Sequence, residues 1–279
     1  MGNLNSKENP LVSIITVTFN AKDYLEQTIQ SVISQTYKHI EYIIIDGGST
    51  DGTVDIIKKY SGHLSFWISE PDKGIYDAMN KGISHANGEI IGIVNASDFY
   101  EPYTIQTVVD ASIQNTLAGI FHGNINMRNE DGTLFKVKRP NNDLQNLAKG
   151  FQLFHPTFFV RKSVYDTIGS YDTSFRMAAD YDFALRCWKN NIKFFYIDRI
   201  LSNFRIGGTT DKKRLQGLEE SKRALLNNGI SAEKAEENYT QWLHDMHKNE
   251  HLRKAYDLLR KIIPQKLMYS ISQYIHVRK

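Results

Sequence analysis

The chain has 279 residues and a formal net charge of +3, with 41% hydrophobic and 23% charged residues. These values are typical of globular proteins, so they exclude a disordered, collagen-like or coiled-coil chain. Cys187 is the only cysteine, which excludes an intrachain disulfide and a multi-thiolate metal site. No apolar run is longer than a strand, so we expect a cytoplasmic protein without a signal peptide or membrane span.

The first 100 residues alternate between apolar, β-branched runs and amphipathic segments. Residues 11–18, for example, read LVSIITVT, and residues 23–34 then place apolar side chains at helical spacing. Such alternation predicts an α/β fold with a mostly parallel sheet flanked by helices on both faces. The predicted strands cover residues 11–18, 39–46, 63–69 and 89–95, and the predicted helices cover residues 23–34, 52–60 and 74–85.

Beyond Asp98 the pattern is less regular. An Asp131-Gly132 pair predicts a hairpin, and therefore antiparallel additions to the sheet. From residue 211 onward the chain is charged and helical in period, with Pro264 as a breaker. We expect an α/β domain over residues 1–210 and a helical extension over residues 211–279. Further helices are predicted over residues 102–114 and 176–189, and short strands over 119–122, 133–137 and 192–196.

Acidic residues follow three of the predicted strands, at Asp46, Asp72 and Asp98. Each by itself is as well explained as a capping residue of a loop or helix. In open parallel sheets, however, ligands bind at the carboxyl ends of the strands, so the three together predict one ligand site. Around Asp98, the run Asn95-Ala96-Ser97-Asp98 offers one carboxylate among polar oxygens. That is enough for Mg²⁺ or Mn²⁺ only when a diphosphate completes the coordination shell.

Other motifs narrow the chemistry further. The glycine-rich segment 46–53 is neither a Walker loop nor Gly-x-Gly-x-x-Gly, which removes the main support for kinase-like and dinucleotide-binding functions. Asp180 and Asp182 open a predicted helix, and only one of them can face a given cleft, as a general base or as a helix cap. His155 could pair with a phosphate or could simply fill a loop. Arg205 could bind an anionic leaving group or could be a surface arginine next to a turn.

Four ordered segments between residues 10 and 210 resemble the family 2 glycosyltransferases with the GT-A, Rossmann-like fold. They read VSIITVTFNA, YIIIDGGSTDGT, SEPDKGIYDAMNKGISHANGEIIGIVNASDFY and AADYDFALR. The third resembles bacterial O-antigen and capsule polysaccharide transferases in particular. The resemblance implies transfer, with inversion, from a nucleotide diphosphate sugar, with UDP favoured. It also implies a divalent metal, Mg²⁺ or Mn²⁺, and a glycan or lipid-diphosphate-linked acceptor.

The resemblance also assigns roles to individual residues. Asp180 matches the carboxylate that deprotonates the acceptor hydroxyl, and Asp98 matches the last aspartate of the metal motif. The nucleotide-sugar positions are Thr18, Asn20, Asp46, Asp72, Lys73, Asn95 and Arg205, with Thr18 and Asp46 near the uracil.

The chain departs from the family where relatives usually read Asn-Ser-Asp-Asp, because Ala96 and Ser97 stand in the middle. Asp98 is then the sole clear metal carboxylate, so a non-catalytic or weakly active sugar-nucleotide-binding protein is the alternative. A sugar nucleotidyltransferase is disfavoured, because no basic glycine-rich signature follows the first strand. The basic residues lack interleaved aromatic residues, which predicts no nucleic-acid partner.

The positive charge is concentrated at the C-terminus. Residues 1–210 hold 20 Lys and Arg against 22 Asp and Glu, whereas residues 211–279 hold 14 against 9. From Lys248 onward, lysine and arginine residues flank apolar residues that recur at helical spacing. This pattern predicts a helix that lies on an anionic membrane, at the cytoplasmic face of the inner membrane, or packs on its own domain or a second subunit.

Overall fold

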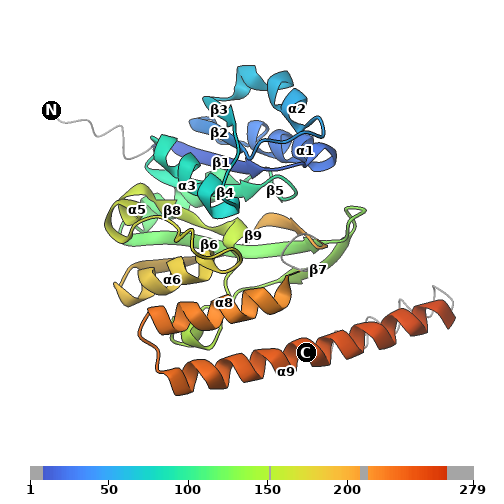
Figure 1. Cartoon of the computed structure of the whole chain (residues 1–279). Helices are drawn as coiled ribbons and strands as arrows, with labels where there is room; N and C mark the ends of the chain where they lie inside the picture. The colour runs from blue at the N-terminus through green and yellow to red at the C-terminus, as the bar shows by residue number, and fades with distance from the viewer. Residues whose placement is uncertain (1–8, 151, 208–212, 263–279) are drawn as a thin grey trace.

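The computed structural model describes residues 9–150, 152–207 and 213–262. Within them the strands form a single sheet with helices on both faces (Figure 1). The strand order is β3-β2-β1-β4-β8-β6-β9-β5, with β7 beside β6. The strands are β1 (Val12–Thr18), β2 (Ile40–Asp46), β3 (Phe66–Ser69), β4 (Ile90–Asn95), β5 (Phe99–Tyr100), β6 (Ala118–Arg128), β7 (Leu134–Lys138), β8 (Phe159–Arg161) and β9 (Lys193–Arg205).

The helices alternate with the strands in the first half of the chain and gather at its C-terminal end. They are α1 (Lys22–Ile33), α2 (Thr53–Lys59), α3 (Ile75–His85), α4 (Thr104–Gln114), α5 (Lys162–Ile168), α6 (Ala179–Lys189), α8 (Arg214–Asn227) and α9 (Ala232–Ile262). Short 3-10 turns cover η2 (Ser61–His63), η3 (Leu144–Lys149) and η4 (His155–Thr157).

The first four strands, β1 to β4, are all parallel, which confirms the predicted fold class. In the pairing of β1 with β2, Thr18 lies opposite Asp46, and in its pairing with β4, Val17 lies opposite Asn95. Strand β3 adds to the outer edge of β2 in the same direction. The carboxyl ends of these strands therefore form one edge of the sheet, as the sequence predicts.

The second half of the sheet is mixed. Strand β8 pairs antiparallel with β4 and β6, and the hairpin of β6 and β7 confirms the turn predicted at Asp131-Gly132. The sequence analysis was wrong to end two strands at residues 122 and 196, because β6 continues to Arg128 and β9 to Arg205. Their later parts contain Asn126 and Asn203, a residue type depleted in strands. Here the two side chains pair with each other at 3.0 Å inside the sheet.

Alternate residues of the central strands enter two hydrophobic clusters, one on each face of the sheet. Ile15 and Val17 of β1 pack with buried residues of α3, α5 and α6. Val12 and Ile14, at the alternate positions of the same strand, face the cluster that contains the apolar sides of α1, α2 and α4. The two-residue period of a strand thus places helices on both faces, as expected for a parallel sheet.

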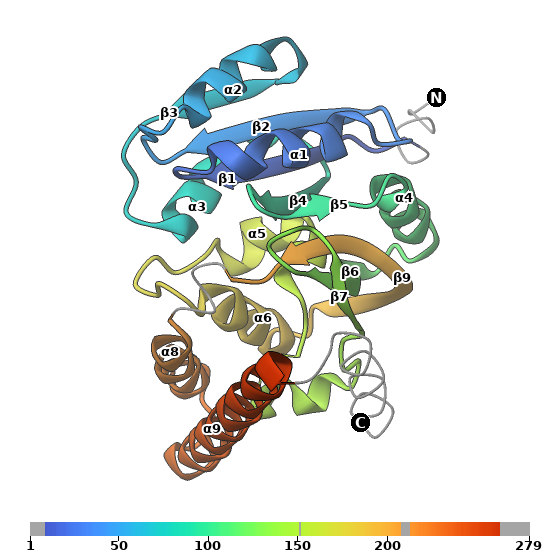
Figure 2. The ribbon, with the colours of Figure 1, turned by 90° about the vertical axis from the view of Figure 1, so that its right-hand side faces the viewer.

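Helices α8 and α9 lie below α6 in Figures 1 and 2. Ala224 and Leu225 of α8 are fully buried in the same cluster as α6, and the Trp242 indole of α9 donates to the Lys149 carbonyl at 2.8 Å. Side chains after Lys248, and all residues after Ile262, lie outside the described part of the chain, so the predicted basic contact surface stays a prediction. Among the helices that are described, none combines the length and apolar character needed to cross a membrane.

Gly88, in the turn that leads into β4, lies very close to the backbone of β1, and this contact generates a stability prediction. A Cβ atom on Gly88 would lie 2.5 Å from the Ser13 backbone nitrogen and 2.8 Å from the Leu11 carbonyl oxygen. Because both atoms belong to the backbone, Gly88→Ala should lower the free energy of unfolding by about 2 kcal/mol in denaturant titrations. Gly62→Ala, where no atom lies within 4 Å, is the matched control and should change it by less than about 0.5 kcal/mol. Equal values for the two variants would contradict the prediction.

Candidate functional site

The turn after β2 is organised by the buried carboxylate of Asp46. Its oxygens accept hydrogen bonds from the Gly48 and Ser49 backbone N–H groups at 3.2 and 2.9 Å. They also accept from the hydroxyls of Ser49 and Ser69. The carboxylate is fully buried, and these hydrogen bonds fix the turn around it. Asp46 therefore lies where the sequence analysis places it, with its oxygens committed to the protein.

The loops that follow β1, β2 and β3 are joined at this edge. Asn20, in a left-handed conformation with φ of 47°, donates its backbone N–H to the Ser49 hydroxyl at 2.7 Å. Its side-chain oxygen accepts from the Thr50 backbone at 2.9 Å. Asp72 approaches Gly47 so closely that a Cβ there would collide with its carboxylate. The structure thus brings together Asn20, Asp46 and Asp72, three of the predicted nucleotide-sugar residues.

Phe19 is a functional candidate that the sequence analysis missed. Its side chain is 62% exposed, yet its ring lies beside Gly47, the residue against which Asp72 packs. An exposed aromatic face at a ligand-binding edge offers a stacking surface for a planar base. The signal was present in the sequence, since an aromatic residue follows a buried strand directly. Lys73 is exposed in the neighbouring loop.

Asp98 lies three residues beyond the end of β4 and is 1% exposed. One carboxylate oxygen, Oδ1, accepts the Arg205 backbone N–H at 3.1 Å. The other, Oδ2, is buried without a hydrogen-bond partner among the described residues. Burial raises the pKa of Asp98 to about 7, although the backbone N–H and charge of Arg205 favour its ionised form. A bound cation would favour the ionised form of this carboxylate and would contact its unpaired oxygen.

Arg205 is the last residue of β9, and the length of this strand brings its backbone to Asp98. Its guanidinium donates to the Gln27 side chain at 2.8 Å and to the Glu130 carbonyl, and lies 4.8 Å from the Tyr24 ring centre. The Arg205 side chain is therefore held by α1 and by the turn between β6 and β7. Its backbone contributes directly to the surroundings of Asp98.

Oxygen atoms near the ends of β1 and β4 suit a divalent cation. Thr18 Oγ1, Asn95 Oδ1 and Asp98 Oδ2 are each buried without a hydrogen-bond partner within the described part of the chain. Such oxygens are the ligands that Mg²⁺ and Mn²⁺ prefer. The described residues contain no group of three His, Cys, Asp or Glu side chains that could hold a metal. The site therefore fits a cation whose shell is completed by substrate oxygens.

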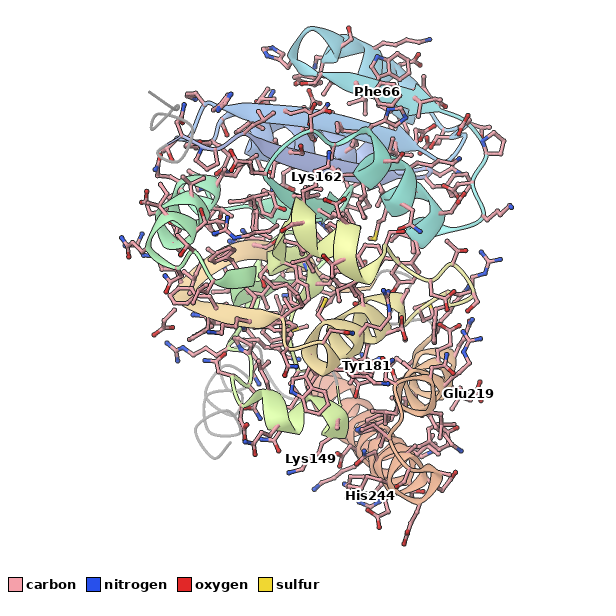
Figure 3. All side chains as sticks on the ribbon, turned by 90° about the vertical axis from the view of Figure 1, so that its left-hand side faces the viewer. Phe66, Lys149, Lys162, Tyr181, Glu219 and His244 are labelled. Carbon is pink, nitrogen blue, oxygen red and sulfur yellow. The ribbon has the colours of Figure 1, made fainter. Side chains whose placement is uncertain are left out.

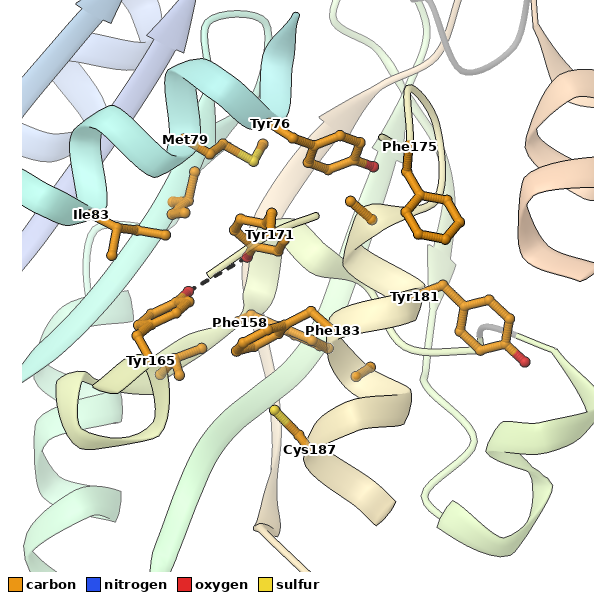
Figure 4. Close-up of a cluster of buried hydrophobic side chains, with 14 of the residues drawn as sticks. Tyr76, Met79, Ile83, Phe158, Tyr165, Tyr171, Phe175, Tyr181, Phe183 and Cys187 are labelled. Carbon is orange, nitrogen blue, oxygen red and sulfur yellow. Dashed lines mark hydrogen bonds between the residues drawn. The ribbon is translucent and has the colours of Figure 1, made fainter. Parts of the chain in front are cut away.

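Asp180 is the second residue of α6, and its carboxylate contacts the first turn of α3. Oδ1 accepts from the Tyr76 hydroxyl at 3.1 Å and from the Tyr181 backbone at 2.9 Å. Burial raises the pKa of Asp180 to about 6, against the hydrogen bonds that favour the carboxylate. Burial also raises the pKa of Tyr76 well above its usual range, so Tyr76 stays the donor. Figure 4 shows Tyr76 extending from α3 towards the segment that carries Phe175.

Asp182 faces away from this pair, as expected for a residue two positions further along a helix. It is 4% exposed, and its oxygens bind Arg186 Nε at 2.8 Å and Asn228 Nδ2 at 3.0 Å. The contacts of Asp182 link α6 to the end of α8. Of the two carboxylates, only Asp180 is available as a base.

His155 is a core residue. Its Nε2 atom pairs with the Tyr171 hydroxyl at 2.9 Å, and burial lowers the pKa of its imidazole to about 4. A neutral, buried imidazole has no charge to offer a phosphate. The structure thus favours the loop-filling interpretation of His155.

Comparison with known proteins agrees with this geometry. The family model for glycosyl transferase family 2 matches residues 13–179. The chain belongs to this family. An uncharacterised glycosyltransferase of Mycobacterium tuberculosis is 38% identical over 181 residues, covering 63% of this chain and 68% of the relative. A PGL/p-HBAD biosynthesis glycosyltransferase of Mycobacterium bovis is 32% identical over 188 residues, covering 65% and 71%.

Solved structures share the GT-A fold of this glycosyltransferase. Staphylococcus aureus TarS 1-349, in complex with UDP-GlcNAc, has a TM-score of 0.60 at 17% identity, covering 83% of this chain and 71% of that one. A mannosyltransferase from Pyrobaculum calidifontis, in complex with GDP-Man and Mn²⁺, has a TM-score of 0.59 at 15% identity, covering 95% and 84%. The chain is therefore a family 2 glycosyltransferase with the GT-A fold.

The pairing of Tyr76 with Asp180 generates a prediction about pH dependence. The Tyr76 hydrogen bond lowers the pKa of Asp180, so its loss in Tyr76→Phe should raise that pKa. If ionised Asp180 is required, the acidic limb of kcat, near pH 6 in the parent protein, should move upward by about half a pH unit or more. Tyr181→Phe removes a hydroxyl that donates to the Leu147 carbonyl, and should leave the limb in place. A Tyr76→Phe profile that coincides with the parent profile would refute the pairing.

Proposed function

We propose that this glycosyltransferase transfers a sugar from a nucleotide diphosphate sugar, with inversion, to a hydroxyl of a growing glycan or lipid-diphosphate-linked acceptor. The observation that carries the proposal is Asp180, a carboxylate of raised pKa that is held by Tyr76 at the beginning of α3. The helix that carries Tyr76 begins three residues after Asp72, at the nucleotide-sugar edge of the sheet. A lipid-linked acceptor would place the reaction at the cytoplasmic face of the membrane.

In the proposed reaction, ionised Asp180 accepts the proton of the acceptor hydroxyl as its oxygen bonds to the anomeric carbon. A sugar hydroxyl is a weak nucleophile near neutral pH, so proton removal during bond formation accelerates attack. The bond from the anomeric carbon to the diphosphate oxygen breaks, and the nucleoside diphosphate leaves with the electron pair. Attack from the face opposite the leaving group inverts the configuration. Tyr76 assists by stabilising the ionised form of Asp180.

The donor would lie along the carboxyl edge of β1 to β4. Asp72 and the turn built by Asp46 suit the nucleoside, with the Phe19 ring as a stacking surface. Asp98, with Asn95 beside it, would hold Mg²⁺ or Mn²⁺. That cation would stabilise the negative charge that develops on the leaving diphosphate. We favour a UDP donor, supported by the family resemblance and by the UDP-GlcNAc bound to the similarly folded TarS.

A donor panel tests this proposal against the non-catalytic alternative, which Ala96 and Ser97 keep open. Release of nucleoside diphosphate would be measured from UDP-, GDP- and dTDP-sugars, with and without lipid-diphosphate acceptors, in Mg²⁺ or in EDTA. A metal-dependent transferase releases product from one donor class and loses that activity in EDTA. Binding of UDP without release from any donor would instead identify a sugar-nucleotide-binding protein.

The role of Asp180 predicts a large and selective loss of activity. Asp180→Asn removes the proton acceptor, so transfer should fall by about 10²-fold or more while UDP affinity, measured by calorimetry, is nearly unchanged. Asp182→Asn is the matched control on the same helix. It breaks the pair with Arg186 and should cost about 3 kcal/mol of stability, with turnover per folded molecule retained. Turnover of Asp180→Asn close to the parent rate would disprove the assignment.

The role of Asp98 predicts a change in metal dependence. Asp98→Asn replaces a charged oxygen ligand by a neutral one, so the Mg²⁺ concentration for half-maximal activity should rise by about tenfold or more. UDP binding in EDTA should be unaffected, because the nucleoside contacts lie on other strands. Asp110→Asn, at an exposed position of α4, controls for the loss of one negative charge. An unchanged Mg²⁺ requirement in Asp98→Asn would exclude Asp98 as the metal ligand.

A further inference from the structure

The N-terminus of α6, which carries Asp180, is capped by a different helix. The first N–H groups of an α-helix have no partner within the helix, and the cap position here is Ala178, whose side chain cannot accept a hydrogen bond. Glu220 of α8 instead binds the backbone of this cap residue and of the two residues before it. Its Oε2 atom binds the backbone N–H groups of Arg176, Met177 and Ala178 at 2.8, 2.7 and 3.2 Å.

Glu220 is itself held in position on α8. Gln216, one turn earlier, donates to its other oxygen at 3.0 Å. One turn later, Arg223 donates to the Ser174 carbonyl at 3.0 Å, and its guanidinium lies 3.9 Å from the ring centre of Phe175. Helix α8 thus contacts the whole segment 174–178 through charged side chains. Figure 3 shows α8, marked by Glu219, beside α6, marked by Tyr181.

The segment 174–178 lies between the two halves of the proposed active site. Towards the donor side, Nη1 of Arg176 would be 2.7 Å from a Cβ atom on Gly74. The Gly74 backbone N–H holds Asp72 at 2.7 Å. In the other direction the segment leads directly into α6, where Asp180 follows Ala178 by two residues. A displacement of this segment would therefore move the base relative to Tyr76 and to the donor.

We propose that Glu220 is a positioning residue for catalysis: by capping the segment before α6 it fixes Asp180 against Tyr76. This inference rests on the proposed role of Asp180 as the base. A charged oxygen that accepts three backbone N–H groups at a helix N-terminus is favoured both as a hydrogen-bond acceptor and by the helix dipole. Since a misplacement of about 1 Å in a reacting group can cost up to about 10²-fold in rate, the cap acts on turnover. Helix α8 is accordingly part of the catalytic apparatus.

The test compares Glu220→Ala, Glu220→Gln and the control Glu219→Ala in the full-length protein. Glu219 is exposed on the same helix. The measured quantity is nucleoside diphosphate release from UDP-GlcNAc, or from the donor that the panel selects, per UDP-binding site counted by calorimetric titration. Unfolded molecules bind no UDP, so they are not counted in a rate expressed per UDP-binding site. Glu220→Ala should lower it by about tenfold or more, Glu220→Gln by less because its amide oxygen still accepts, and Glu219→Ala should match the parent.

A double-mutant cycle separates positioning from stability. If Glu220 acts through Asp180, Glu220→Ala combined with Asp180→Asn should be no slower than Asp180→Asn alone, because the position of an absent base has no effect. If Glu220→Ala binds no UDP, the cycle is run with Glu220→Gln. The inference is overturned if the Glu220 variant equals Glu219→Ala, or if it slows Asp180→Asn by its full factor. Normal turnover of Asp180→Asn would instead refute the proposed function itself.

Discussion

The parallel register of β1 with its neighbours β2 and β4 is the constraint on which the rest of this structure depends. It places Thr18 opposite Asp46, and Asn95, the last residue of β4, opposite Val17. Because parallel strands have their carboxyl ends at the same edge of the sheet, the loops after β1, β2 and β4 must meet there. The turn of Asp46, the Asn20 contacts and the burial of Asp98 all follow from that meeting. In the proposed function, this edge binds the donor.

Buried polar groups at the edge divide into two classes by how well they are satisfied. The carboxylate oxygens of Asp46 have protein partners, and such groups fix the backbone around them. Asp98 and Asn95 each retain a buried oxygen with no partner among the described residues. Leaving such an atom unpaired costs free energy, and at the carboxyl edge of the sheet a bound cation would remove that cost. The presence or absence of protein partners therefore distinguishes Asp46, which shapes a turn, from Asp98 and Asn95, which are the candidates for cation binding.

The C-terminal helices show how a peripheral element becomes part of the site. Ala224 and Leu225 join the cluster that buries the apolar face of α6, so α8 is held close to the helix that carries Asp180. Asp182 and Asn228 link the same two helices one turn further along α8. With α8 held by these contacts, the Glu220 carboxylate is directed at the backbone N–H groups of the segment that leads into α6. Packing and polar contacts therefore act together on the proposed base.

The amino-acid sequence by itself determined the parallel half of the sheet and the loops in which the site lies. Hydrophobic periodicity is a local property, readable over ten to twenty residues, and residues such as Asp46 and Asp98 follow directly from the strand ends it defines. Only the tertiary structure decided the partners. Arg205 meets Asp98 across 107 residues of chain, and Glu220 meets Ala178 across 42. The Asn126 and Asn203 pairing that extends β6 and β9 is equally distant in sequence, across 77 residues. No local pattern encodes such contacts, because each depends on where the packed core brings two remote segments together.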